Sequence, residues 1–553
     1  MMKKILFRTL MSIALIAFSI IKSDACTNFL ITKGASTDGS CMITYAADSH
    51  VLFGELYFWA ATDYPEGTWL DIYEWDTGKK LGKIKQVAHT YSVVGNMNEN
   101  QVSIGETTYG GREELMDPNA IMDYGSLIYV ALQRSKTARE AIKIMTDLVA
   151  EYGYASSGES FSIADPNEVW IMEMISKGPG NKGAVWVAQR IPDGYISGHA
   201  NQARTRQFPL NDPINCLYSS DIISFAKDKG YYPKDKKNED FSFLDAFAPM
   251  NFHGLRFCEA RVWAGFRKFN KKMDSYTDYA TGENAKNIMP LWIKPDKKLT
   301  VQDVMSLMRD HFEGTVLDMT KDVGAGPFQN PYRWRPLTWK VDSVEYCNER
   351  AISTQQTGFS FVTQSRSFLP NPVGGIIWFG VDDASSSVYV PMYCGITRVP
   401  ETFAVGNGSM MDYSADAAFW VFNQVSNYAY TRYNLIYPEI QKAQQELENK
   451  FVALSAGADK AATELYKKDK NLAIEYLTDF SVNQGNYTVK KWQGLYAYLF
   501  TKYMDGNVKT KKAIPENYKY VTPEIDQPGY GEDYYRAITN QKGEHFKVKE
   551  EGH

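Results

Sequence analysis

Cysteine, histidine and surplus positive charge are all scarce in this chain, and each shortage excludes a class of protein. Among 553 residues there are only six cysteines and seven histidines. The formal net charge of -5 argues against a general nucleic-acid binder. His-Glu-x-x-His, Cys-x-x-Cys and Gly-x-Ser-x-Gly motifs are all missing, and no two histidines stand at a metal-ligand spacing. We therefore expect no metal, no cofactor and no nucleic-acid partner.

Long hydrophobic runs are also few, and the most informative one lies at the N-terminus. Three basic residues precede an uncharged, mostly apolar run over residues 10–21, and small residues follow at Ser23 and Ala25. This pattern predicts a signal peptide over residues 1–25 and export to the periplasm or the cell exterior. The alternative is an uncleaved anchor. No later segment reaches about 18 apolar residues, so stable membrane insertion is not expected.

Cleavage after Ala25 would make Cys26 the first residue of the mature chain. An N-terminal cysteine combines a nucleophilic thiol with an α-amine, whose ordinary pKa is about 8, that can accept the thiol proton. Three alternatives stay open: a disulfide, an ordinary buried thiol, or a lipidated cysteine. The last of these would make the protein a non-catalytic surface binding module.

Asp48 is expected to lie near Cys26. Two β-rich runs, residues 27–32 and 41–45, flank the turn dipeptide Asp38-Gly39. Folded as a hairpin, these runs return Asp48 to within a few residues of the level of Cys26. A carboxylate there would orient the α-amine and stabilise its protonated form. The alternative role for Asp48 is a cap at the end of the strand.

Five sequence blocks follow one another along the chain. They are Cys26-Thr27-Asn28 with Ala47-Asp48-Ser49, residues 96–108, residues 158–170, residues 186–202 and residues 366–393. In this order they resemble the dipeptidase A family of N-terminal-nucleophile cysteine peptidases, which are related to secernins and more distantly to penicillin V acylases and bile salt hydrolases. The resemblance spans residues 26–510. It implies an exported cysteine dipeptidase that hydrolyses short peptides through a thioester.

The resemblance also implies a catalytic set of four residues. Cys26 is the nucleophile, its α-amine is the general base, and Asp48 orients that amine. Asn201, with a second donor from residues 105–107, stabilises the oxyanion. Arg366 organises the site or grips a substrate carboxylate. For substrate binding we expect Glu106, Thr107, Glu173 and Arg204, although solvated strand-end carboxylates remain the alternative for both glutamates.

Tyr45 departs from the family pattern, which usually has an arginine three residues before the motif aspartate. A phenol donates a hydrogen bond but supplies no permanent cation to lower the pKa of the thiol. Either another arginine, such as Arg112, Arg204 or Arg366, fills this space, or the site works without the charge. Arg366 is the expected replacement.

The expected fold class is α+β, and the resemblance makes it a four-layer αββα sandwich with a helical C-terminal extension. Local patterns predict a helix over 135–152 and strand pairs around turns at 165–168, at 192–194 and between 379 and 388. The expected domains are a hydrolase domain over 26–410, a helical extension over 411–510 and an irregular tail over 511–553.

Two further questions stay open at the level of sequence. A dipeptidase needs charged groups for both ends of its substrate, whereas an acylase or amidase of the same fold needs an apolar pocket for a non-peptide amide. The many aromatic residues leave that second option open. A homo-oligomer is compatible with the sequence.

Overall fold

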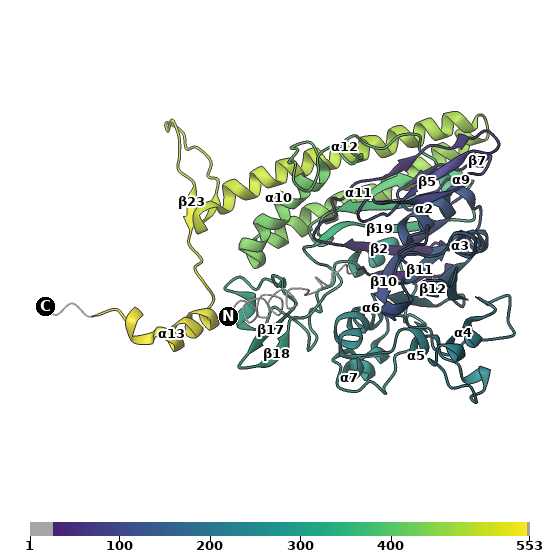
Figure 1. The fold of residues 1–553 in the computed structure, drawn as a ribbon. Coiled ribbons are helices and arrows are strands. Elements are labelled where there is room, and N and C mark those ends of the chain that lie inside the picture. Colours follow the sequence, from purple (N-terminus) through teal and green to yellow (C-terminus); the bar gives the residue numbers. More distant parts are fainter. Residues whose placement is uncertain (1–25, 550–553) are drawn as a thin grey trace, which may run out of the picture.

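The computed structural model describes residues 26–549, and mixed helix and sheet confirm the α+β class (Figure 1). The predicted signal peptide lies outside the described residues. A seven-stranded sheet has the order β16-β14-β1-β2-β19-β20-β21, all neighbours antiparallel. Its strands are β16 (Trp292–Ile293), β14 (Ile196–His199), β1 (Asn28–Ile31), β2 (Met42–Asp48), β19 (Thr357–Ser365), β20 (Gly375–Val381) and β21 (Val390–Tyr393).

A second, eight-stranded sheet has the order β15-β13-β12-β11-β10-β9-β8-β3. Its strands are β15 (Cys216–Tyr218), β13 (Ala184–Arg190), β12 (Val169–Ser176), β11 (Gly158–Ala164), β10 (Ser103–Gly110), β9 (Met97–Asn98), β8 (Val93–Val94) and β3 (Phe58–Trp59). Every residue of β11, β12 and β19 is buried, as expected for strands covered on both faces.

The two sheets face each other closely where β10 meets the first sheet. The Oγ of Ser103 on β10 lies 3.2 Å from the Oγ1 of Thr363 on β19. A Cβ atom at Gly105 would lie only 2.7 Å from the side-chain amide of Asn28, so glycine is required for this approach. The core between the sheets therefore holds the N-terminal hairpin directly against β10.

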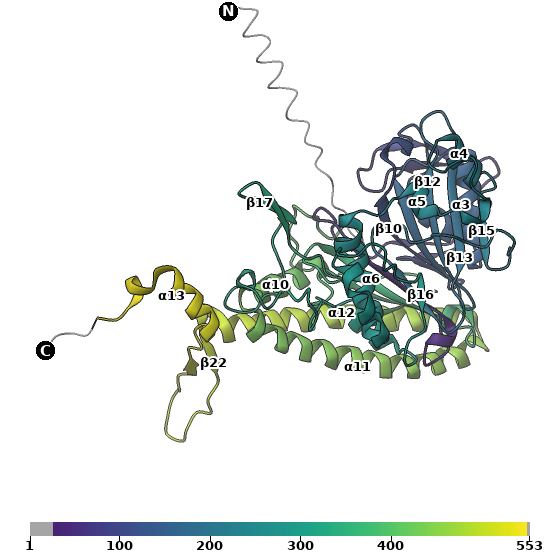
Figure 2. The same cartoon turned by 90° about the horizontal axis from the view of Figure 1, so that it is seen from below.

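Helices cover the outer faces of both sheets (Figures 1 and 2). On the eight-stranded sheet lie α2 (Tyr124–Arg134) and α3 (Ala138–Tyr152). Against the seven-stranded sheet pack α9 (Asn371–Gly374), α10 (Ala418–Thr431), α11 (Tyr433–Tyr466) and α12 (Lys470–Tyr503), with α11 and α12 side by side. The apolar face of each helix is thereby buried, which is what stabilises it in the folded chain.

The remaining elements are short or peripheral. Two-stranded sheets join β4 (Thr62–Asp63) to β7 (His89–Thr90), β5 (Trp69–Tyr73) to β6 (Lys80–Lys85), β17 (Thr338–Val341) to β18 (Val344–Cys347), and β22 (Val508–Thr510) to β23 (Glu524–Asp526). The other helices are α4 (Ile222–Asp228), α5 (Phe243–Phe247), α6 (Ala260–Phe269), α7 (Thr277–Ala280), α8 (Val301–Leu307) and α13 (Glu532–Phe546).

Most local predictions are confirmed. The strands at 27–32 and 41–45 form the hairpin β1–β2, with Leu30 opposite Ile43. The predicted helix is α3, which begins after Thr137, whose side chain accepts a hydrogen bond from the backbone N–H of Glu140. The pairs β11–β12 and β20–β21 form as expected.

The expected strand pair around residues 192–194 is wrong. β13 belongs to the eight-stranded sheet and β14 to the seven-stranded one, so the chain crosses between sheets at this turn. Asp193 Oδ1 accepts a 2.6 Å hydrogen bond from the backbone N–H of Gly34, which fixes the crossover to the N-terminal hairpin. A turn sequence alone does not show whether the two flanking strands pair with each other.

The C-terminal third is largely helical, as the sequence predicts for residues 411–510. The chain bends at Arg432, and Pro438 lies inside α11 near its start. Beyond α12, the α13 helix has no buried residue and stands apart from the body of the molecule (Figure 2). Over residues 26–549, no helix is both long and apolar enough to cross a bilayer. The domain limits stay a prediction.

Candidate active site

Cys26 lies just before β1 and lines a cavity of about 260 Å³ between the hairpin and the eight-stranded sheet. The residue is 6% exposed. The cavity combines acidic groups with aromatic rings, among them Tyr45, Asp48, Tyr57, Trp75, Asp76, Glu106, Tyr124 and Phe359. A buried thiol at the wall of a cavity of this kind can meet a small substrate away from bulk water.

Asp48 reaches this cavity as the hairpin predicts. Thr27 is bridged to Ala46, so the last residue of β2 returns to the level of Cys26. Asp48 Oδ2 accepts a 2.6 Å hydrogen bond from Arg350 Nη2, and Oδ1 accepts one of 2.6 Å from Thr357 Oγ1. Burial raises the pKa of Asp48, and both of these partners act to lower it.

The thiol of Cys26 is held in its neutral form. Its Sγ lies 3.6 Å from Glu106 Oε1 and 3.8 Å from the Tyr45 hydroxyl, which itself donates to Glu106. Burial raises the pKa of Cys26 well above its usual value, and the carboxylates of Glu106 and Asp48 raise it further. The backbone N–H of Asp48 and the Tyr45 hydroxyl oppose this only in part. A nucleophilic Cys26 therefore needs a base to take its proton.

Arg261, which the sequence analysis missed, is the arginine that contacts Cys26. Its Nη1 donates to the Cys26 carbonyl at 2.6 Å and to Thr27 Oγ1 at 2.8 Å. Its Nη2 donates to the Ala200 carbonyl at 3.1 Å and to Asn201 Oδ1 at 2.9 Å. Burial, and then repulsion from Arg350, lowers the pKa of Arg261 to about 10. An arginine within the buried apolar helix α6 is the one signal that could have identified it.

Asn201 is brought to the site by the same arginine. Its backbone has a φ of +59°, a left-handed conformation that asparagine tolerates better than most residues. Besides accepting from Arg261, its side chain donates a 2.7 Å hydrogen bond from Nδ2 to the Thr108 carbonyl. Asn201 is thus fixed between the N-terminal hairpin and β10, one contact away from Cys26.

Glu106 lines the cavity as expected, but the structure corrects the other three substrate-binding predictions. Thr107 Oγ1 lies 2.7 Å from His199 Nδ1, buried between the sheets. Glu173 Oε1 accepts the backbone N–H of Arg204 at 2.6 Å, and the Nε of Arg204 donates to Glu259 Oε1 at 2.8 Å. These three side chains hold the core together and do not line the cavity.

The prediction that Arg366 organises the site is wrong. Arg366 follows β19 at the end where Ser365 is bridged to Cys41, and Asp48 lies opposite Thr357 at the other end. Thr357 and Ser365 are eight residue steps apart along β19, a length of about 26 Å. The Arg366 guanidinium instead pairs with Asp459 of α11. Arg112 does not line the cavity at Cys26 either, and its Nε donates to the Ala246 carbonyl at 2.6 Å.

Cys26 forms no disulfide with another described cysteine. All six cysteines, which lie within the described residues, are free. In the part of the chain that the structure describes, no group of three or more histidine, cysteine, aspartate or glutamate side chains could hold a metal ion.

Comparisons with known proteins agree on one family. The family description "Peptidase family C69" matches residues 25–446. A protein of Salmonella dublin named "Probable dipeptidase" is 27% identical over 67% of this chain and 81% of its own length. One with the same name from Latilactobacillus sakei is 26% identical over 69% of this chain and 77% of its own. "Probable dipeptidase B" of Streptococcus pyogenes serotype M1 is 24% identical over 88% of this chain and 95% of its own length. The predicted relationship is confirmed, and the chain belongs to peptidase family C69.

Proposed function

We propose that this peptidase is an exported cysteine dipeptidase that acts through Cys26 as its N-terminal residue. The observation that carries the proposal is Cys26 at the wall of a cavity, beside the buried pair of Asp48 and Arg350. Family membership and the names of the relatives support peptide hydrolysis. The signal-like pattern over residues 1–25 supports both export and exposure of Cys26 by a single cut.

We assign the two facing sheets with helices outside to the four-layer sandwich of N-terminal-nucleophile hydrolases. In such enzymes the amine of the first residue serves as the base, which is the group that Cys26 otherwise lacks. Burial and two carboxylates raise the pKa of the Cys26 thiol, so it is not a thiolate before the substrate arrives. A free α-amine next to this thiol, oriented by Asp48, would supply the missing proton acceptor.

The proposed reaction has two steps, formation of a thioester and its hydrolysis. Sγ of Cys26 attacks the scissile carbonyl carbon while the thiol proton moves to the α-amine. The donor that we propose for the resulting oxyanion is the second N–H of Asn201 Nδ2, beside the one that donates to the Thr108 carbonyl. The C–N bond breaks, the α-ammonium returns the proton to the leaving amine, and a thioester remains. Water then attacks the thioester with the α-amine again as base, which releases the first amino acid and restores the thiol.

The charged lining of the cavity favours a dipeptide over a non-peptide amide. Glu106 and Asp76 are both part of the wall, and carboxylates suit the free ammonium group of a peptide. An acylase would be expected to present an apolar wall at this place.

The test compares Cys26→Ala with a matched change at a second thiol of the same hairpin. Cys41 is buried, and burial raises its pKa to about 12, so it is an inert control. The mature enzyme and Cys41→Ala should hydrolyse dipeptides better than N-acyl amino acids. Cys26→Ala should hydrolyse neither dipeptides nor N-acyl amino acids, and its thermal melt should be unchanged. Dipeptide hydrolysis by Cys26→Ala would refute the proposal, and a preference for N-acyl amino acids would favour the acylase.

A further inference from the structure

A second cavity, of about 330 Å³, adjoins the one at Cys26. Ser49 and Leu52, which follow Asp48 in the chain, line both cavities and form their junction. Beyond the junction the walls are aromatic and amide-bearing, with Trp334, Phe419, Trp420, Tyr430, Asn423 and Asn427. Four aromatic side chains and several amides around one space suit an apolar side chain next to a polar main chain.

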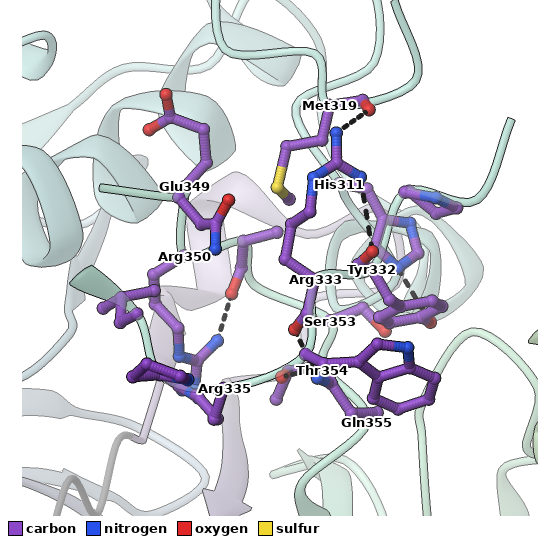
Figure 3. Close-up of a pocket in the computed structure, with 16 residues that line it drawn as sticks. His311, Met319, Tyr332, Arg333, Arg335, Glu349, Arg350, Ser353, Thr354 and Gln355 are labelled. Carbon is purple, nitrogen blue, oxygen red and sulfur yellow. Dashed lines mark hydrogen bonds between the residues drawn. The ribbon is translucent and has the colours of Figure 1, made fainter. Parts of the chain in front are cut away.

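Arg335 lies on the wall of this second cavity and of the small pocket behind it. Figure 3 shows Arg335 beside Arg350 at one side of that pocket, with His311 and Tyr332 at the other. The Nε of Arg335 donates to Gln356 Oε1 at 3.0 Å, and its Nη2 donates to the same oxygen.

Arg335 differs from its neighbours in having no acidic partner. Arg333 pairs with Asp322 and Arg350 with Asp48. Among residues 26–549, no carboxylate forms an ion pair with Arg335. Arg335 is half-buried, and its hydrogen-bond acceptor is a neutral amide. Burial removes part of the water around the guanidinium, and no paired carboxylate of the described chain replaces it.

The charges around Arg335 make this wall of the cavity positive. Burial, followed by repulsion from Arg350, lowers the pKa of Arg335 to about 10, and Arg261 adds to that repulsion. Only Asp48 acts in the opposite direction. A further anion placed here would relieve the repulsion and would face a planar donor suited to two parallel hydrogen bonds.

We propose that the second cavity binds the C-terminal residue of the substrate, with Arg335 gripping the α-carboxylate and the aromatic wall taking the side chain. The proposal rests on the proposed function, because this residue is the leaving group when Cys26 attacks. The first cavity contains Glu106, Asp76 and Cys26. Arg335 lies in the second cavity, beyond the junction formed by Ser49 and Leu52. This order matches the ammonium, scissile bond and carboxylate of a dipeptide with a large apolar C-terminal residue.

The carboxylate grip is tested with Ala-Phe and its C-terminal amide as paired substrates. Arg335→Gln should raise KM for Ala-Phe by about 10- to 100-fold, the value of a lost charge-assisted hydrogen bond, and leave the amide unaffected. Arg335→Lys should recover part of the loss. Lys340→Gln removes one positive charge from the exposed β17 strand outside both cavities and should behave as wild type.

The paired substrates separate a direct grip from an indirect effect. Gln356 Nε2 donates to the Asp48 carbonyl at 3.4 Å, so loss of Arg335 could displace Asp48. That displacement would lower kcat for acid and amide alike, and equal losses, or no loss, would overturn the proposal. If the wild-type enzyme cleaves no dipeptide at all, the proposed function itself fails.

The aromatic wall is tested with two exposed tryptophans of one segment. Trp334 lines the cavity and is 65% exposed, whereas Trp339 of β17 is 40% exposed and lines neither cavity. Trp334→Ala should lower kcat/KM for Ala-Phe by about tenfold and leave Ala-Gly nearly unchanged. Trp339→Ala should change neither substrate. Equal effects of Trp334→Ala on both dipeptides would contradict a side-chain subsite.

Discussion

Two buried arginine–aspartate pairs lie at opposite ends of the same two strands, β2 and β19. At one end Asp48, opposite Thr357, pairs with Arg350 at 2.6 Å. At the other end Arg366, next to Ser365, pairs with Asp459. The two pairs have the same chemistry, yet only the first lies at a cavity with a thiol.

Their surroundings explain the difference. The guanidinium of Arg366 also donates to the carbonyls of Val373 and Gly374, so it ties α9 and α11 to the end of β19. Asp48 lines a cavity, and the backbone N–H of the same residue points to the Cys26 sulfur. A buried ion pair in one of these sequence blocks can therefore have a structural or a catalytic role. Whether it lies at a cavity distinguishes the two roles.

The largest expected contrast is between Asp48→Asn and Asp459→Asn. Each substitution leaves a buried arginine without its carboxylate, which costs about 3 kcal/mol of the free energy of unfolding. Only Asp48→Asn should also lower kcat/KM, by about 100-fold or more, because it removes the group that is proposed to orient the base. Thermal melts and steady-state kinetics well below both melting temperatures measure this. A comparable loss of activity in Asp459→Asn would remove the distinction between the two ends.

The next contrast concerns pH and compares Arg350→Gln with Arg366→Gln. Burial raises the pKa of Asp48, and Arg350 opposes that rise because a cation favours the carboxylate. Without Arg350 the pKa of Asp48 rises further, so the ionised form needed to hold an ammonium appears only at higher pH. The acid limb of kcat/KM should move up by about one pH unit in Arg350→Gln. An equal movement in Arg366→Gln would show that both pairs act on the site.

Tyr45→Phe should have the smallest effect. The substitution removes one hydrogen bond to Glu106, worth about 1 kcal/mol, or about fivefold in kcat/KM. Burial raises the pKa of Tyr45 well above its usual value, so the hydroxyl stays neutral and the acid limb should not move. A shift as large as that of Arg350→Gln would instead give Tyr45 the role of the arginine that the family usually has there.

Elements formed by residues close in sequence could be predicted, and those formed by distant residues could not. The β1–β2 hairpin and α3 follow from local turn, capping and periodicity signals. The crossover between β13 and β14 could not be predicted, because its turn is fixed by Gly34, 159 residues away. Nothing in the local turn sequence carries that information.

The same limit explains which site residues were found. Asp48 is predictable because a short hairpin returns it to Cys26. Arg261 and Arg350 reach Cys26 and Asp48 from 235 and 302 residues away in the sequence. Neither lies in the sequence blocks that resemble the family. Arg366 lies in such a block, but the register of β19 places it at the far end of the sheet.

In the proposed mechanism the amine of Cys26, once free, is the base that activates its own thiol. The direct test compares enzyme that begins at Cys26 with enzyme that keeps Ala25, which converts the amine into an amide and changes no side chain of the site. Intact mass verifies each N-terminus, and dipeptide hydrolysis is then measured on both. We expect equal thermal melts and a loss of kcat/KM of about 100-fold or more in the extended form. Equal activity of the two forms would contradict it.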